Sequence, residues 1–191
     1  RHQARRQARR PRQGAAPPVM AGRQWHSRLV GGVGDRVLRG WLTEAGSLTA
    51  RCQAACRDFR VRLLRYGKAA PLADESPGRR HAWVREVVLE CDGVPVIFAH
   101  TTLSTATNGR LTRWLSRLGS RSLGSLLFSW PSFRRGAIEY CRLDARHPLF
   151  RRAAVHGGSG KYLWARRSLH RLGRQEVLVT EVFLPAITRL K

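Results

Sequence analysis

The 191-residue chain has few cysteines, few acidic side chains and no long apolar run, and each shortage excludes a class of protein. No apolar stretch approaches the roughly 18 to 20 residues that a membrane-spanning helix needs, and none near the start has the pattern of a secretory signal. The four cysteines are too few for a disulfide framework in a chain of this length. A zinc site would need partners at metal-binding spacing, and the sequence contains no C-x-x-C or H-x3-H pair. We therefore expect a soluble cytoplasmic protein with no metal site and no membrane span.

The scarcity of acid makes the chain strongly basic, because 12 Asp and Glu stand against 36 Lys and Arg for a formal net charge of +24. Such a surface could bind nucleic acid or anionic lipid, or attract a small anion to a site. Outside the N-terminal segment the basic residues are spread along the chain and form no tight cluster interleaved with aromatic residues. We therefore attribute the charge to a generally Arg-rich composition and expect no specific nucleic-acid partner. We also expect a monomer. A basic nucleic-acid-binding protein is an alternative, and it predicts strongly salt-dependent binding.

The chain divides by composition at about residue 24. Residues 1–24 contain no Leu, Ile, Phe or Tyr, so this segment is predicted to be a disordered basic N-terminal arm. We expect the natural start of the protein to lie at or near Met20, the only methionine. The alternative is that these residues form a functional nucleic-acid-binding arm. Residues 25–191 have ordinary globular composition and the length of one domain.

The globular part is predicted to be an α+β domain with a single antiparallel sheet of about six strands and helices packed on one face. Two pairs of β-rich runs flank Asp92-Gly93 and Gly173-Arg174, which are signals for tight hairpin turns. No β-α-β alternation is visible. The other two strands are predicted at 59–67 and 133–144, and short helices at 33–46, 47–56, 109–119 and 122–130.

One charged residue interrupts the apolar face of the first predicted hairpin. Side chains alternate between the two faces of a strand, so Trp83, Arg85, Val87 and Leu89 lie together on the more apolar face. Arg85 is the only charged member of that set, and a charge directed at a core is costly unless it has a partner.

A second misplaced charge, of opposite sign, lies in the last predicted strand. Glu181 stands within VLVTEVFLP (177–185), which is apolar on both faces. One interpretation is a buried salt bridge with Arg85, or an arginine whose head reaches solvent. The other is an interior pocket in which the guanidinium binds a ligand carboxylate and the carboxylate accepts a hydrogen bond from a ligand hydroxyl. The pattern alone leaves both open.

Other polar residues carry weaker signals. Arg166 and Arg167 are adjacent in a predicted strand, so at most one can face such a pocket, and we expect both to be surface charges. His100 is a lone strand histidine, for which a structural role is favoured. No phosphate-binding loop, dinucleotide-binding glycine motif or nucleophile elbow is present.

Four segments, in order, resemble the chorismate pyruvate-lyase (chorismate lyase) family: W-V-R-E-V-V-L-E-C-D-G-V-P (83–95), L-G-S-R-S-L-G-S-L-L-F (118–128), L-W-A-R-R-S (163–168) and V-T-E-V-F-L-P (179–185). The resemblance covers roughly residues 25–187. It implies a cofactor-free carbon–oxygen lyase with an enclosed pocket beneath helical flaps. Such an enzyme eliminates pyruvate from chorismate to give 4-hydroxybenzoate for ubiquinone biosynthesis.

The resemblance also implies residue roles. Arg85 would hold the ring carboxylate and Glu181 would meet the ring hydroxyl, and these two are the expected catalytic residues. Leu48 and Leu123 would bind substrate or product through backbone groups. The family often has methionine where this chain has Leu48, so Leu48 departs from the family pattern. A non-catalytic ligand-sensing domain of the same fold is the alternative, although residues 1–24 are too short and polar to form the helix-turn-helix domain of such regulators.

Overall fold

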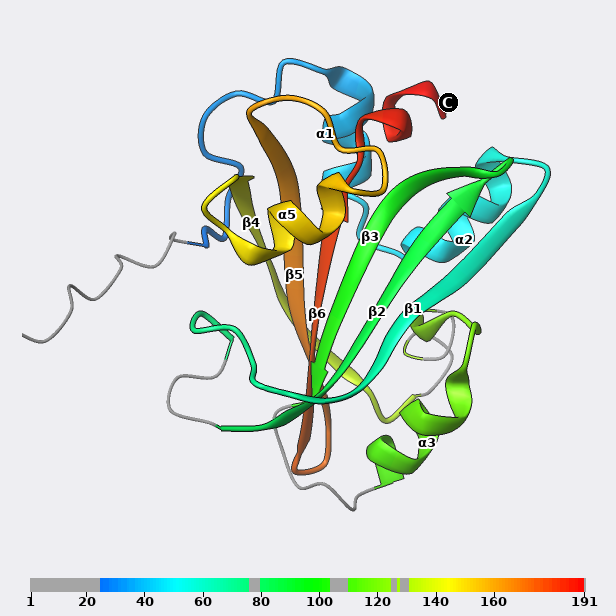
Figure 1. Ribbon diagram of the computed structural model, residues 1–191, viewed down its shortest axis with the longest axis vertical. Helices are drawn as coiled ribbons and strands as arrows, with labels where there is room; N and C mark the ends of the chain where they lie inside the picture. The colour runs from blue at the N-terminus through cyan, green and yellow to red at the C-terminus, as the bar shows by residue number, and fades with distance from the viewer. Residues whose placement is uncertain (1–24, 76–79, 104–109, 125–126, 128–130, 191) are drawn as a thin grey trace, which may run out of the picture.

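Six antiparallel strands form one sheet in the computed structural model, which describes residues 25–75, 80–103, 110–124, 127 and 131–190 (Figure 1). Their order across the sheet is β1-β2-β3-β6-β5-β4, so two three-stranded meanders meet where β3 pairs with β6. The strands are β1 (Phe59–Ala69), β2 (Ala82–Cys91), β3 (Val94–Leu103), β4 (Arg134–Asp144), β5 (Tyr162–Leu172) and β6 (Gln175–Phe183). The predicted sheet is confirmed.

Both predicted hairpins form at the predicted residues. Asp92 and Gly93 connect β2 to β3 with φ angles of 50° and 78°, as the two central residues of a mirror-image hairpin turn require. Gly173, with a φ of 57°, begins the turn between β5 and β6. Glycine and aspartate tolerate this backbone region better than most residues, which explains why these dipeptides locate the turns.

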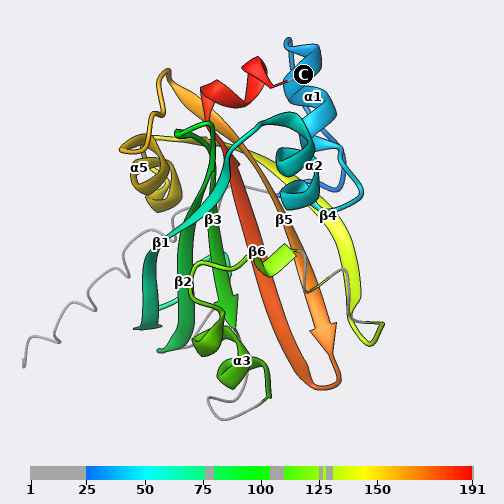
Figure 2. The ribbon, with the colours of Figure 1, turned by 90° about the vertical axis from the view of Figure 1, so that its right-hand side faces the viewer.

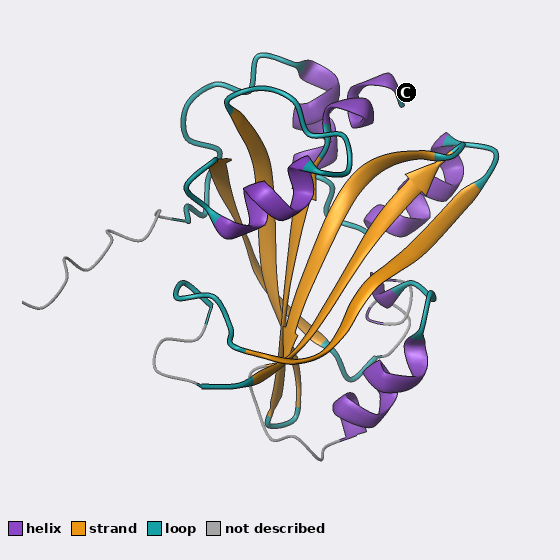
Figure 3. Cartoon of the chain, in the orientation of Figure 1, coloured by secondary structure: helices purple, strands orange, loops and turns teal. Residues whose placement is uncertain are grey.

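Short helices flank the sheet (Figure 3). Ser47 accepts a hydrogen bond from the backbone of Ala50 and caps one of them, as its position predicts; Asp35 caps another in the same way through Leu38. The helices are α1 (Arg36–Leu42), α2 (Leu48–Ala55), α3 (Arg110–Leu118), α5 (Pro148–Ala154) and the 3₁₀ helix η1 (Pro185–Arg189).

Helices cover both faces of the sheet rather than one, as Figure 2 shows. One face packs against α1, α2 and η1 through a core that includes Trp41 and Leu48, and α3 joins a second core on the same side. The opposite face packs against α5, where Leu149 and Ala153 contact Val88 of β2 and neighbouring strand residues. The central strands are largely buried on both faces and therefore need both covers. Helix α5 was not among the helices predicted from the sequence.

The predicted division of the chain at residue 24 lies outside the described residues, and so does the predicted arm before it. In the part of the chain that the structure describes, no helix is long and apolar enough to cross a membrane.

His100 lies in a buried polar network on the α5 face, which agrees with its expected structural role. Its Nδ1 is 2.8 Å from Oε1 of Glu86 and its Nε2 is 3.0 Å from Oε1 of Glu75. Arg152 of α5 donates to Glu86 at 2.7 Å, and the hydroxyl of Thr102 donates to Glu75 at 3.0 Å. The network joins the loop after β1 and helix α5 to the centre of the sheet.

This network should make stability depend on pH. Burial alone would lower the pKa of His100, but its two carboxylate partners raise it above 6.5. Burial alone would raise the pKa values of Glu75 and Glu86, but His100 lowers both below 4.5. The stabilisation from His100 is complete below about pH 6.5 and is lost as pH rises through its folded pKa. That from the carboxylates is present above about pH 4.5 and is lost on acidification.

We predict that His100→Asn lowers the free energy of unfolding by about 3 kcal/mol near pH 5.5, because it removes the buried cation that Glu75 and Glu86 share. The difference from wild type should shrink as the pH rises through the raised pKa of His100, because the wild-type imidazole then loses its charge. Urea denaturation across a pH series that starts at 5.5 measures this. The exposed His81→Asn is the control and should leave the free energy of unfolding unchanged. A loss that grows with pH would contradict the assignment.

Candidate active site

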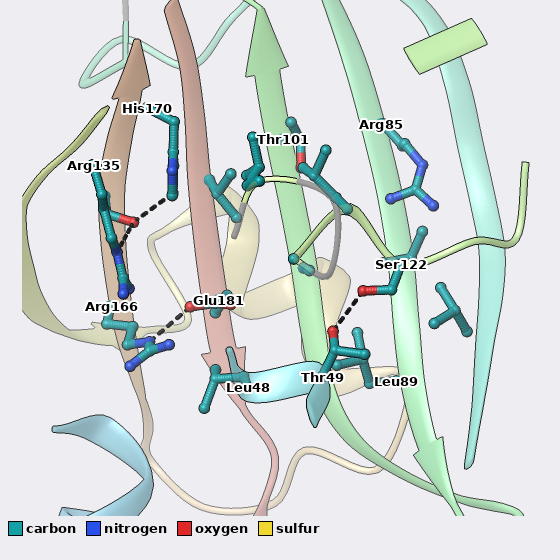
Figure 4. A pocket seen from close by; sticks show the side chains of 18 residues that line it. Leu48, Thr49, Arg85, Leu89, Thr101, Ser122, Arg135, Arg166, His170 and Glu181 are labelled. Atoms are coloured by element: carbon teal, nitrogen blue, oxygen red, sulfur yellow. Dashed lines mark hydrogen bonds and ion pairs between the residues drawn. The ribbon is translucent and has the colours of Figure 1, made fainter. Parts of the chain in front are cut away.

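A single pocket on the α2 and α3 side of the sheet collects the residues that the sequence singles out. It holds about 580 Å³ of empty space, solvent at its opening included. Strands β2, β3, β5 and β6 form its floor, the first turn of α2 covers one part, and the segment after α3 covers another (Figure 4). Arg85, Glu181, Leu48 and Leu123, the four predicted site residues, all line it.

The sheet register sets the distance between the two predicted charges. Arg85 lies opposite Thr101, and Thr101 lies opposite Val179, so these three share a row across β2, β3 and β6. Glu181 is two residues further along β6 and points to the same face. Two strand spacings and one step of two residues place the two backbones roughly 12 Å apart. With both side chains directed into the pocket, this separation leaves room for one small ring between them.

The Arg85 guanidinium is buried, with 3% of the residue exposed. Its Nη2 donates to the backbone carbonyls of Gly119 and Arg121 at 2.9 and 2.8 Å, just beyond the C-terminal end of α3. Its Nε is buried and has no hydrogen-bond partner, and no carboxylate among the described residues pairs with this side chain. Burial lowers the pKa of Arg85 to about 10, so the group is still charged at neutral pH. A buried cation in this state favours binding of an anion.

Glu181 pairs with Arg166 and not with Arg85, so the interpretation of a mutual salt bridge is wrong. Nε of Arg166 donates to Oε2 of Glu181 at 2.7 Å. Nη1 of Arg166 donates to the backbone carbonyls of Leu42 and Glu44 at 3.3 and 2.5 Å, in the connection between α1 and α2. The glutamate is thereby fixed beneath the first turn of α2.

The expectation that Arg166 is a surface charge is also wrong, because only 1% of it is exposed. Strand β5 is covered on both faces, so its charged residues need partners inside the protein. Arg167 points to the opposite face, where it pairs with Glu139 at 2.7 Å, and its side chain is 15% exposed. The alternation rule, by which only one of the two could face the pocket, is confirmed.

Sequence reasoning missed a connected polar group in the pocket, formed by Arg135, Ser168 and His170. Nε of Arg135 donates to the hydroxyl of Ser168 at 3.2 Å, and this hydroxyl lies 3.1 Å from Nε2 of His170. Burial, followed by the nearby charges of Arg135 and Arg166, lowers the pKa of His170 to about 4, so its imidazole is neutral at physiological pH. The sequence signal for the β5 members was that Arg166, Ser168 and His170, at every second position, place polar side chains on one face of the strand.

The two covers of the pocket contact each other. The hydroxyl of Ser122 donates to that of Thr49 at 2.7 Å, which joins the segment after α3 to α2. Gly124 lies so close to α2 that a β-carbon there would come within 3.3 Å of the hydroxyl oxygens of Ser47 and Thr49. Leu123, beside it, is 6% exposed. The covers close over the ligand space because a glycine permits this approach.

Together these groups define a small-ligand site with a cation at one end and a carboxylate at the other. Such a site fits a compact ring that carries an acid opposite a hydroxyl.

The sequence profile of the chorismate lyase family matches residues 34–190, and the chain belongs to this family. The probable chorismate pyruvate-lyase of Dechloromonas aromatica is 69% identical over 172 residues, which cover 88% of this chain and 98% of that protein. The probable chorismate pyruvate-lyase of Methylobacillus flagellatus is 43% identical over 173 residues, covering 87% and 96%.

Among solved structures, the effector domain of PhnF from Mycobacterium smegmatis matches with a TM-score of 0.46 and 20% identity, covering 73% of this chain and 89% of that one. The ligand-binding domain of a putative GntR-family regulator from Bordetella bronchiseptica matches with a TM-score of 0.47 and 18% identity, covering 69% and 88%. Likenesses this remote support no statement about ligand or activity.

The β5–β6 hairpin contains one buried and one exposed cross-strand ion pair, and the exposed pair is a matched control for the buried pair. Arg166–Glu181 and Arg171–Glu176 have the same 2.7 Å separation, but the arginine side chains are 2% and 61% exposed. We predict that Arg166→Met lowers the free energy of unfolding by about 3 to 5 kcal/mol, because Glu181 loses its partner in a largely buried position. Arg171→Met should cost less than about 1 kcal/mol. Urea denaturation measures both.

A small and equal loss in the two variants would show that Arg166 does not hold Glu181. Adding Glu181→Leu to Arg166→Met removes the unpaired carboxylate and should restore part of the lost stability.

Proposed function

We propose that this protein is a chorismate pyruvate-lyase that converts chorismate to 4-hydroxybenzoate and pyruvate without a cofactor. The observation that carries the proposal is the buried Arg85 guanidinium, which faces the pocket with an unpartnered Nε across from Glu181. Membership of the chorismate lyase family names the ring acid that this arrangement would take.

In the proposed complex, Arg85 binds the ring carboxylate. Its Nη2 already holds two backbone carbonyls, so Nε and Nη1 remain to donate to a carboxylate. Glu181 accepts a hydrogen bond from the ring hydroxyl, since an ion-paired carboxylate offers only acceptors. Leu48 and Leu123 line the ring between these ends and present backbone groups to it.

The reaction needs little from the protein beyond orientation. The bond between the ring and the enolpyruvyl ether oxygen breaks, and the hydrogen on the hydroxyl-bearing ring carbon moves to the enolpyruvyl methylene. The ring gains a double bond and becomes aromatic, while the released fragment is pyruvate. Because aromatisation supplies the driving force, binding chorismate in the reactive geometry and stabilising charge on the ether oxygen account for the catalysis. Glu181 orients the hydroxyl in this scheme.

We place the reaction in the cytoplasm, in the supply of the ubiquinone head group, and expect the enzyme to act as a monomer. The basic surface, with a net charge of +24, would attract the chorismate dianion, and added salt should weaken this attraction.

We predict turnover of chorismate by the purified protein without added metal, followed by the absorbance of the aromatic product. Arg85→Ala and Glu181→Ala should each lower kcat/KM by about 100-fold or more, because each removes a buried charged contact to the substrate. The controls are Arg62→Ala and Glu176→Ala, which remove exposed or half-exposed charges away from the pocket and should leave kcat/KM within about twofold.

Binding of 4-hydroxybenzoate by calorimetry separates the alternatives. A wild-type protein that binds 4-hydroxybenzoate but never consumes chorismate would overturn the lyase proposal and favour the ligand-sensing module. Full activity in both pocket variants would overturn the site assignment.

A further inference from the structure

The pocket carries more positive charge than a single carboxylate would need. Among its described lining residues, the charged side chains are three arginines and one glutamate: Arg85, Arg135, Arg166 and Glu181. His170 adds no charge at neutral pH, because burial and the two neighbouring guanidinium groups keep it deprotonated. Two positive charges therefore remain in excess. Aromatic acids such as 4-hydroxybenzoate supply one negative charge, whereas chorismate supplies two.

The additional cations lie at the end of the pocket opposite Arg85. Arg135 of β4 and Arg166 of β5 project into the same end as Glu181, and Figure 4 shows them together on one side with Arg85 on the other. Burial, followed by the charge of Arg166, lowers the pKa of Arg135. Two adjacent cations in a partly buried wall repel each other, and a bound anion would relieve that repulsion.

Backbone and side-chain contacts fix Arg135 in this position. Its Nη1 donates to the carbonyl of Ala45 at 2.7 Å and its Nε to Ser168 at 3.2 Å. Arg166 is held by Glu181 and by two carbonyls of the α1–α2 connection. Arg166 thus serves to position Glu181, and Arg135 supplies a second guanidinium at the same end of the pocket.

The shape of chorismate places its second acid at this end. The enolpyruvyl ether is attached to the ring carbon next to the one that carries the hydroxyl. With the ring carboxylate on Arg85 and the hydroxyl on Glu181, the enolpyruvyl group is attached at the Glu181 end of the ring, where its carboxylate can reach Arg135. We propose that Arg135, supported by Arg166, binds the enolpyruvyl carboxylate of the substrate, which gives the pocket a second anion subsite. This proposal rests on the proposed function for the identity of the ligand.

The second subsite would distinguish substrate from product. Chorismate contacts both anion subsites, whereas 4-hydroxybenzoate retains only the ring carboxylate and contacts Arg85 alone. Cleavage releases the Arg135 contact together with pyruvate. The same guanidinium would stabilise negative charge that develops on the departing fragment. Arg135 would therefore act on substrate affinity and rate, with little effect on how tightly the product is held.

The test compares ligands with one and two carboxylates in Arg135→Met and Arg135→Lys. Loss of a charged hydrogen bond should raise KM for chorismate about 10- to 100-fold in Arg135→Met. The Kd of 4-hydroxybenzoate, measured by calorimetry, should stay within about twofold of wild type. Arg135→Lys keeps the charge without the fork and should recover part of the lost affinity. Arg134→Met removes the same charge from an exposed neighbouring position and should behave like wild type with both ligands. This control distinguishes a direct contact between Arg135 and the ligand from the general electrostatic attraction of a basic protein.

A stable aromatic dicarboxylate, 3-(1-carboxyvinyloxy)benzoate, makes the test independent of turnover. Its Kd should rise about 10- to 100-fold in Arg135→Met relative to wild type and should not change in Arg134→Met. If wild type fails to consume chorismate, the proposed function fails, but this binding comparison still decides the subsite. An unchanged Kd for the dicarboxylate, or an equal loss for it and 4-hydroxybenzoate, would overturn the proposal.

Discussion

The arrangement of the site depends on one buried guanidinium that no carboxylate of the described residues neutralises. Arg85 binds two backbone carbonyls beyond the end of α3 and directs an unpartnered Nε into the interior. The carbonyls at a helix C-terminus carry partial negative charge, which compensates part of the cost of burying the cation. A ligand carboxylate would supply the rest. Arg85 therefore both anchors the segment after α3 and favours an anion in the pocket beneath that segment.

A charged side chain also anchors a cover at the opposite end of the pocket. Among the described residues Glu181 pairs with Arg166, and that arginine also binds the carbonyls of Leu42 and Glu44. The connection that leads into α2 is thus fixed to β5, and α2 in turn supplies Leu48 and Thr49 to the pocket. Each end couples a charged side chain on the sheet to a cover above it. Changes that disturb either charge should consequently affect the covers as well as the ligand.

The sequence predicts the sheet well, because its signals are local. Asp92-Gly93 specifies a turn by backbone conformation alone, and strict alternation assigns Arg85 to a face. The pairing of Glu181 with Arg166 follows from the turn at Gly173-Arg174, because a two-residue loop sets the β5–β6 register and places residue 166 opposite residue 181. It was missed because Arg166 was expected to be a surface charge. Arg135 is further from prediction, since it reaches the pocket from an edge strand whose register shifts between Arg135 and Ile138. The participation of Leu48 and Leu123 came from the family resemblance and not from any pattern of their own.

Polar residues occupy both faces of the central strands, and this explains how the site is kept in place. In β2, Arg85 faces the pocket while Glu86, the next residue, joins His100 and Arg152 on the α5 face. In β3, Thr101 lines the pocket while His100 lies in the network behind it. Each buried network fixes the backbone of its strand, so the α5 face restricts where Arg85 and Thr101 can point. The hydrogen bonds of the second face therefore help to preorganise the ligand-binding face, although none of them reaches the ligand.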